Sequence, residues 1–90
     1  TISESVINSL VYNVAKKFEG IKKVVKVRNK NLNDGVIIEI EIMCLYGYNL
    51  MEVMSKLAEK IKVEIDRMTA LNIEKLNIET KSIVMDKDEN

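Results

Sequence analysis

Apolar residues near the start of the chain recur every three or four positions. These positions are Val6, Ile7, Leu10, Val11, Val14 and Phe18. Such spacing puts them on one face of a helix and predicts a helix over residues 3–19. Ser3 or Thr1 is suited to accept a hydrogen bond at its start, and Gly20 is suited to end it.

The pattern then changes to strict alternation, which is typical of strands with one buried face. It predicts strands over 23–29 and 36–46, joined by a turn over the polar segment 31–35. Pairing the strands about a centre between Asn33 and Asp34 puts apolar beside apolar and opposite charges beside each other. The predicted pairs are Val27 with Ile40, Val25 with Ile42, Arg28 with Glu39, and Lys26 with Glu41.

Helical spacing returns over residues 50–68, where Asn49 can cap the helix start and Glu52 can return the hydrogen bond. The expected buried stripe consists of Leu50, Val53, Met54, Leu57, Ile61, Ile65 and Met68. Alternation over residues 72–81 predicts a last strand, with Leu76, Ile78 and Thr80 facing one way and Asn77, Glu79 and Lys81 the other.

The element order α-β-β-α-β predicts an α+β fold, because each amphipathic element must bury its apolar side. We expect a two-layer sandwich: a three-stranded mixed sheet with both helices on one face, the last strand being parallel to the second. The opposite face of the sheet would then meet water or a partner. Residues 1–85 form a single predicted domain, and residues 86–90 read as a solvated tail.

The chain has 14 basic and 14 acidic side chains, so there is no overall attraction to nucleic acid or anionic lipid. Residues 16–30, however, contain seven basic side chains and one acidic side chain. An alternative hypothesis is therefore a nucleic-acid or lipid patch that uses Lys16, Lys17, Lys22, Lys23 and Lys30. The element order invites comparison with K-homology RNA-binding domains, but their Gly-X-X-Gly loop is missing, and a solvated basic surface is the simpler interpretation.

Residues suited to catalysis are scarce. Cys44 is the single cysteine and the chain has no histidine to activate it, while its position in the alternation predicts a buried side chain. Glu39 and Glu41 share a strand face, but Lys26 and Arg28 opposite them favour ion pairs over acid–base catalysis or metal binding. The residues predict neither an enzyme nor a cofactor or metal. A lone thiol, and the lack of an apolar run of about 20 residues, fit a cytoplasmic domain.

Several segments, in order, resemble the alkaline-shock (envelope stress response) protein family of Gram-positive bacteria. The central ones run from Tyr46 to Leu50, from Met68 to Leu71, and from Leu76 to Ile78. Val53, Ile61 and Val63 match between them, and Ile2-Ser3-Glu4, Val6-Ile7 and Glu19-Gly20-Ile21 are similar to the family's first helix and its exit. The resemblance covers residues 2–84. It departs at Ala70, where the family usually has glycine; alanine resists positive φ, so we expect a reshaped turn.

The resemblance implies a cytoplasmic, membrane-proximal scaffold without catalysis, which self-associates or is recruited by a related membrane anchor; the departure suggests the soluble domain of such an anchor paralogue. A protein partner, such as an anchor or a family paralogue, would use the open sheet face. The residues expected on this surface are Lys26, Arg28, Glu39, Glu41, Met43 and Tyr48. Single exposed apolar residues such as Met43, Leu45 and Val63 would mark an interface if they joined into one patch.

Overall fold

The computed structural model describes residues 3–86 and has the predicted order of elements. These are α1 (Glu4–Lys16), β1 (Ile21–Leu32), β2 (Gly35–Leu45), α2 (Leu50–Thr69) and β3 (Ile73–Val84). The predicted α+β class is confirmed. β1 and the C-terminal end of β3 extend further than the alternation indicated, because backbone pairing continues past the alternating segments, whereas β2 ends one residue before the predicted end. Of the predicted tail, Asp86 is exposed, and residues 87–90 lie outside the described residues.

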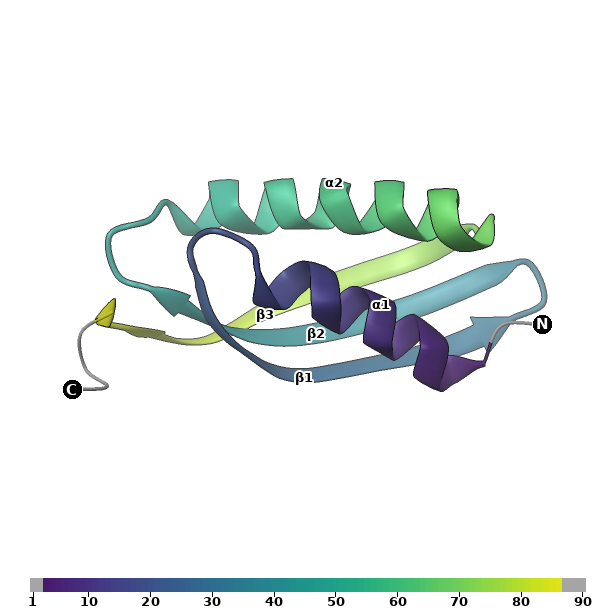
Figure 1. Ribbon diagram of the computed structural model, residues 1–90, viewed down its shortest axis with the longest axis horizontal. Coiled ribbons are helices and arrows are strands. Elements are labelled where there is room, and N and C mark those ends of the chain that lie inside the picture. Colours follow the sequence, from purple (N-terminus) through teal and green to yellow (C-terminus); the bar gives the residue numbers. More distant parts are fainter. Residues whose placement is uncertain (1–2, 87–90) are drawn as a thin grey trace.

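The three strands lie in the order β1-β2-β3, with β2 in the centre. β1 runs antiparallel to β2, and β3 runs parallel to it. Both helices lie over the same face of the sheet (Figure 1). α1 crosses β1, and α2 lies next to α1 and runs along the sheet. The predicted two-layer sandwich with a mixed sheet is therefore confirmed, and its second face has no covering layer among the described residues.

The core lies between the helices and the inward face of β2. Ile38, Ile40, Ile42 and Cys44 of β2 are at most 1% exposed. They pack with Ile7 and Val11 of α1 and with Leu57, Ile61 and Ile65 of α2. Because a fully buried aliphatic side chain contributes roughly 1.5–3 kcal/mol, this layer fixes which face of the sheet is covered.

The ends of α1 depart in part from the prediction. Ser3 caps the start, its Oγ accepting a hydrogen bond from the Val6 backbone N–H at 3.3 Å. The helix ends at Lys16, so the predicted end directly before Gly20 is wrong. Gly20 instead closes the following turn at φ +96°, where an added Cβ would lie 2.9 Å from Val53 Cγ2. Close approach to α2, together with positive φ, explains the glycine.

The ends of α2 hold one confirmation and one correction. Asn49 caps the start as predicted, its Oδ1 accepting from the Glu52 backbone N–H at 3.0 Å. The Glu52 carboxylate lies 3.4 Å from Lys56 Nζ. Met68 was expected in the buried stripe but is 53% exposed, and it lines a surface groove with Val6 and Leu10 of α1.

The turn after α2 keeps a left-handed residue even though that residue is alanine. Ala70 has φ 60° and ψ 16°, and its N–H donates to the Asp66 carbonyl at 3.0 Å. Thr69 Oγ1 supports the turn by accepting from the Leu71 N–H at 3.0 Å. The expectation that Ala70 reshapes this turn is therefore wrong.

The hairpin register agrees with the prediction until a β-bulge interrupts it. Val27 pairs with Ile40, Arg28 with Glu39, and Lys26 with Glu41, as predicted. Beyond Lys26 the register shifts, so Ile42 pairs with Val24 rather than Val25. Such a bulge inserts one extra residue into one strand and changes which side chain faces inward. The predicted core position of Val25 is wrong, since Val24 is buried and Val25 is 43% exposed.

Candidate functional site

The uncovered face of the sheet is the candidate functional surface, and β2 runs through its middle. The outward side chains of β2 are Ile37, Glu39, Glu41, Met43 and Leu45, which alternate with the buried ones. β1 lies on one side with Lys23, Lys26, Arg28 and Lys30 in register with this row. β3 lies on the other side with Lys75, Asn77 and Glu79 in register with this row, and Lys81 follows at a register shift. The face thus has a basic edge, an acidic middle and a mixed edge.

Ion pairing organises the middle of this face. Arg28 Nη2 lies 3.0 Å from Glu39 Oε1, with the two side chains 56% and 47% exposed. Lys26 stands opposite Glu41 in the register, and on β3 Lys81 Nζ lies 3.8 Å from Glu79 Oε2. Exposed pairs of this kind contribute about 0–1 kcal/mol each, so they add little to the stability of the fold.

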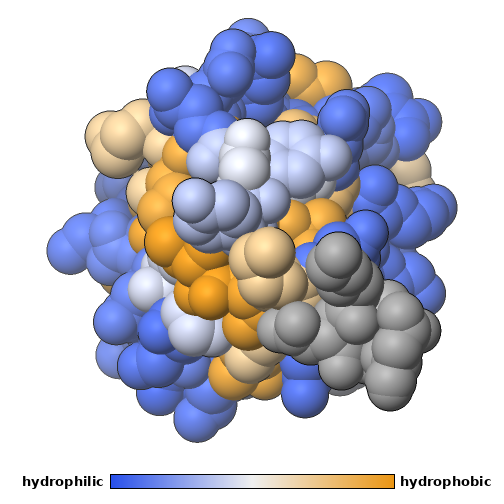
Figure 2. Space-filling model, turned by 90° about the vertical axis from the view of Figure 1, so that its left-hand side faces the viewer, coloured by the Kyte–Doolittle hydropathy of each residue, from blue (hydrophilic) through white to orange (hydrophobic). Residues whose placement is uncertain are grey.

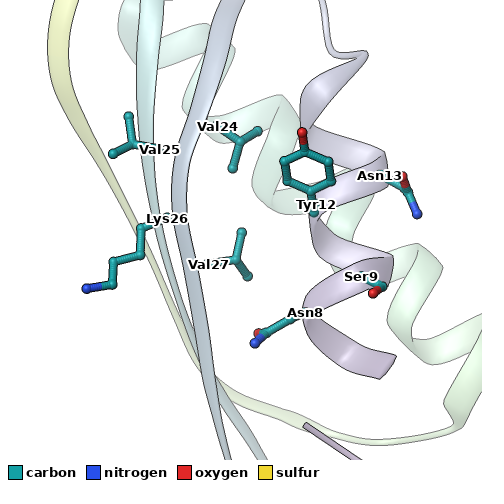
Figure 3. A pocket seen from close by; sticks show the side chains of 8 residues that line it. All are labelled: Asn8, Ser9, Tyr12, Asn13, Val24, Val25, Lys26 and Val27. Carbon is teal, nitrogen blue, oxygen red and sulfur yellow. The ribbon is translucent and has the colours of Figure 1, made fainter. Parts of the chain in front are cut away.

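The β-bulge adds an apolar side chain that the alternation did not predict on this face. Val24 and Val27 point toward α1, whereas Val25 and Lys26 point away from it (Figure 3). Val24 and Val27 also form a wall of a shallow hollow of about 370 Å³ between β1 and α1, which Asn8 and Tyr12 line from the helix. In the sequence, the one sign that the alternation could fail here is the pair of adjacent valines, Val24 and Val25.

Five of the six predicted surface residues come together on the open face, and Tyr48 does not. The strand ends at Leu45, so the alternation does not extend to Tyr48. Its ring lies beside Gly20 at the corner between the first turn and α2. Its hydroxyl lies 3.5 Å from Glu19 Oε2, to which it donates a hydrogen bond.

A second group of exposed apolar side chains lies at the end of the molecule where β2 and β3 terminate. Tyr46 is 70% exposed and Met51, at the start of α2, 73%. Ile83 and Met85, at the end of β3, are 49% and 45% exposed. Figure 2 views this end and shows an apolar area bordered by polar side chains. Met43 and Leu45 of the open face are half-buried and pair with Ser82 and Val84, so they lie close to this end. Val63 is exposed on α2 and lies apart from it.

The basic segment does not form one surface. Lys16 and Lys17 lie at the end of α1, where Lys16 Nζ sits 5.4 Å from the centre of the Tyr12 ring. Lys22 and Lys23 lie near the start of β1, and Lys30 is paired near its other end. Lys30 is seven positions after Lys23, a span of about 23 Å at ~3.3 Å per residue. The five residues of the nucleic-acid hypothesis are therefore divided between two locations.

The residues considered for catalysis have ordinary structural roles. Cys44 is buried as predicted, with Sγ 3.6 Å from Thr80 Oγ1. Thr80 Oγ1 in turn donates to Met54 Sδ at 3.4 Å. Within residues 3–86, no three His, Cys, Asp or Glu side chains are grouped closely enough to hold a metal. These contacts tie β2, β3 and α2 together, and they keep the Cys44 thiol in the core.

One carboxylate has a clearly shifted pKa, and it lies away from the open face. The pKa of Glu64 on α2 is lowered, mainly by the hydrogen bond from Arg67 Nη2 at 2.7 Å. Burial raises this pKa by less than that hydrogen bond lowers it, and the charges of Arg67 and Lys60 lower it further. Lys60 Nζ lies 3.5 Å from its second oxygen. Glu64 is therefore ionised at neutral pH and lines a groove of about 430 Å³ between the helices, together with Leu10 and Phe18.

Neither helix in the part of the chain that the structure describes combines the length and apolar composition needed to cross a bilayer.

Solved structures with the same fold include several of the MamM CTD. A zinc form has 13% identity and a TM-score of 0.62, over 87% of this chain and 84% of that chain. A variant has 12% identity and a TM-score of 0.63, over 87% and 93%. At such identity the likeness shows the fold alone.

Two comparisons with known sequences complete the identification. No curated protein matches the chain. A family model does match it, over residues 22–85, which is most of the chain. That segment contains β1, β2, α2 and β3, and with them the whole of the open sheet face. The chain therefore belongs to the alkaline-shock protein 23 family, which is described as having a cell envelope-related function.

Proposed function

We propose that this domain is a non-enzymatic scaffold that binds proteins in cell-envelope homeostasis and stress response. Family membership supports the envelope-related role. The observation that carries the binding role is the uncovered sheet face, on which Lys26, Arg28, Glu39, Glu41 and Met43 lie together. An acidic middle beside a basic edge, with Ile37 and Met43 in the same row, offers area and specificity without a catalytic group.

The proposed setting is the cytoplasm beside the membrane. In this model a membrane anchor or a paralogue of the same family recruits the domain. The exposed apolar end, with Tyr46 and Met51, extends the same binding surface, because large exposed tyrosine and methionine side chains are favoured at interfaces.

The test is co-purification of the tagged full-length protein from gently solubilised cells of its own host, with and without nuclease. We compare the wild type with Glu39→Lys on the open face. Glu59→Lys is the matched control, because it makes the same charge change on the exposed side of α2. Loss of the exposed Arg28 pair in E39K costs about 1 kcal/mol or less, so the variant remains folded.

We expect a nuclease-resistant membrane protein or family paralogue with the wild type and with E59K, and much less of it with E39K. Equal recovery with E39K would exclude the open face. Recovery only of nucleic acid and its bound proteins, lost on nuclease treatment, would contradict the scaffold proposal. It would favour binding through Lys16, Lys17, Lys22, Lys23 and Lys30 instead.

A further inference from the structure

The outer edge of β3 has no strand beside it among the described residues. β3 is 12 residues long and pairs with β2 on its inner side only. Register irregularities occur between its partners Val36 and Ile37 and again between Ile42 and Met43. The segment between them, Lys75–Thr80, is regular. An exposed regular edge is a template for another strand unless its side chains prevent pairing.

The side chains of this segment favour pairing with a second copy of themselves. We propose that β3 pairs antiparallel with β3 of another copy of this chain, centred on Asn77. In this register Lys75 of each copy stands opposite Glu79 of the other on the open face, which makes two ion pairs. On the helix side, Leu76 of each copy stands opposite Ile78 of the other. Opposite charges and apolar pairs in these positions stabilise an antiparallel ladder.

The same charges disfavour the two next registers toward the end of β3. Centring the pairing on Ile78 places Lys75 opposite Lys81, and centring it on Glu79 places that carboxylate opposite its own copy. The other free edge, β1, is less suited to self-pairing, because its ionisable residues on the open face are all basic and no register can give opposite charges. These residues are Lys23, Lys26, Arg28 and Lys30. Like charges directly opposite one another destabilise strand pairing.

Burial along β3 is consistent with a missing neighbour. Leu76 and Ile78 are only half-buried, whereas their β2 partners Ile38 and Ile40 are 0% and 1% exposed. Antiparallel pairing of two β3 strands has its two-fold axis normal to the sheet, so both helical layers lie on one side. The α2 helices of the two copies then approach each other and cover Leu76 and Ile78. The two sheets join into one continuous six-stranded sheet.

The inference deepens the proposed function by naming one partner, a second copy, and one surface, the outer edge of β3 that borders the open face. The experiment is sedimentation equilibrium of the purified domain from micromolar to millimolar concentration. K75E and E79K should each weaken the dimer about tenfold or more, since each turns two attractive pairs into repulsive ones. The double variant K75E/E79K restores opposite charges and should return the dissociation constant to near that of the wild type.

Lys30→Glu is the matched control, because it makes the same charge change on the other edge and should leave the dimer unaffected. As a second measurement, backbone amide shifts of the wild type should change with concentration within residues 75–79. A monomeric wild type at millimolar concentration would overturn the proposal, as would concentration-dependent shifts confined to other strands. Failure of the double variant to restore the dimer would overturn the register. None of these results depends on an envelope partner, so failure here is distinguishable from failure of the scaffold proposal.

Discussion

The alanine at the end of α2 provides a sharp test of the structure. Ala70 has φ 60° and ψ 16°, which is the left-handed conformation that glycine adopts without a steric penalty. Its side chain is exposed, so it contributes little packing. Replacing Ala70 with glycine should therefore stabilise the domain, although adding glycine at the end of a helix makes the unfolded chain more flexible.

The size of the effect follows from two opposing terms. A left-handed conformation costs a residue with a Cβ roughly 1–2 kcal/mol. Glycine increases the conformational entropy of the unfolded chain, which costs about 0.4–1 kcal/mol on folding. The midpoints of the two ranges leave a net stabilisation of about 0.8 kcal/mol. For a domain of this size that corresponds to a rise in Tm of roughly 3–6 °C.

The assay is thermal unfolding by calorimetry, together with urea unfolding of the wild type and A70G. Ala58→Gly is the matched control, because it makes the same change inside α2, where the backbone is helical. That control should lower stability by about 1 kcal/mol, since glycine is disfavoured in a helix interior. If A70G were neutral or destabilising while A58G behaved as expected, the left-handed assignment of Ala70 would be refuted.

Two further predictions concern the core and pH. Ile40→Asp should leave the domain unfolded at 25 °C, because it removes a side chain that is 1% exposed and buries an unpaired charge. Ile37→Asp, three residues earlier in β2 and on the open face, should still unfold cooperatively in circular dichroism. A soluble, cooperative I40D would show that the strand facing is wrong. Because Arg67 lowers the pKa of Glu64, this pair stabilises the fold at neutral pH and loses its contribution as pH falls through the lowered pKa of the folded state. Below the usual glutamate pKa, the urea midpoint should therefore fall more steeply with decreasing pH for the wild type than for Glu64→Gln. Parallel curves for the two proteins would contradict the assignment.

The proposed surfaces were predictable from sequence to different extents. Alternation in β2 places Glu39 and Glu41 opposite Arg28 and Lys26 without any tertiary information, and the structure has those pairs in register. Val25 escaped this reasoning because a bulge has no period-2 signature. The β3 edge escaped it as well, because which strands are left at the edges depends on the strand order and not on any one strand.

The sequence alone determined the elements, their inward faces and the hairpin register near the turn, because periodicity and turn chemistry act over a few neighbouring residues. It also indicated the family. Only the tertiary structure decided where the register shifts, that Tyr48 leaves the sheet face, that Met68 is exposed and that Ala70 adopts positive φ. These features depend on how helices, strands and turns pack against one another. A locally unfavourable backbone conformation or a displaced side chain is tolerated when the packing of the whole core lowers the free energy by more than the local conformation costs.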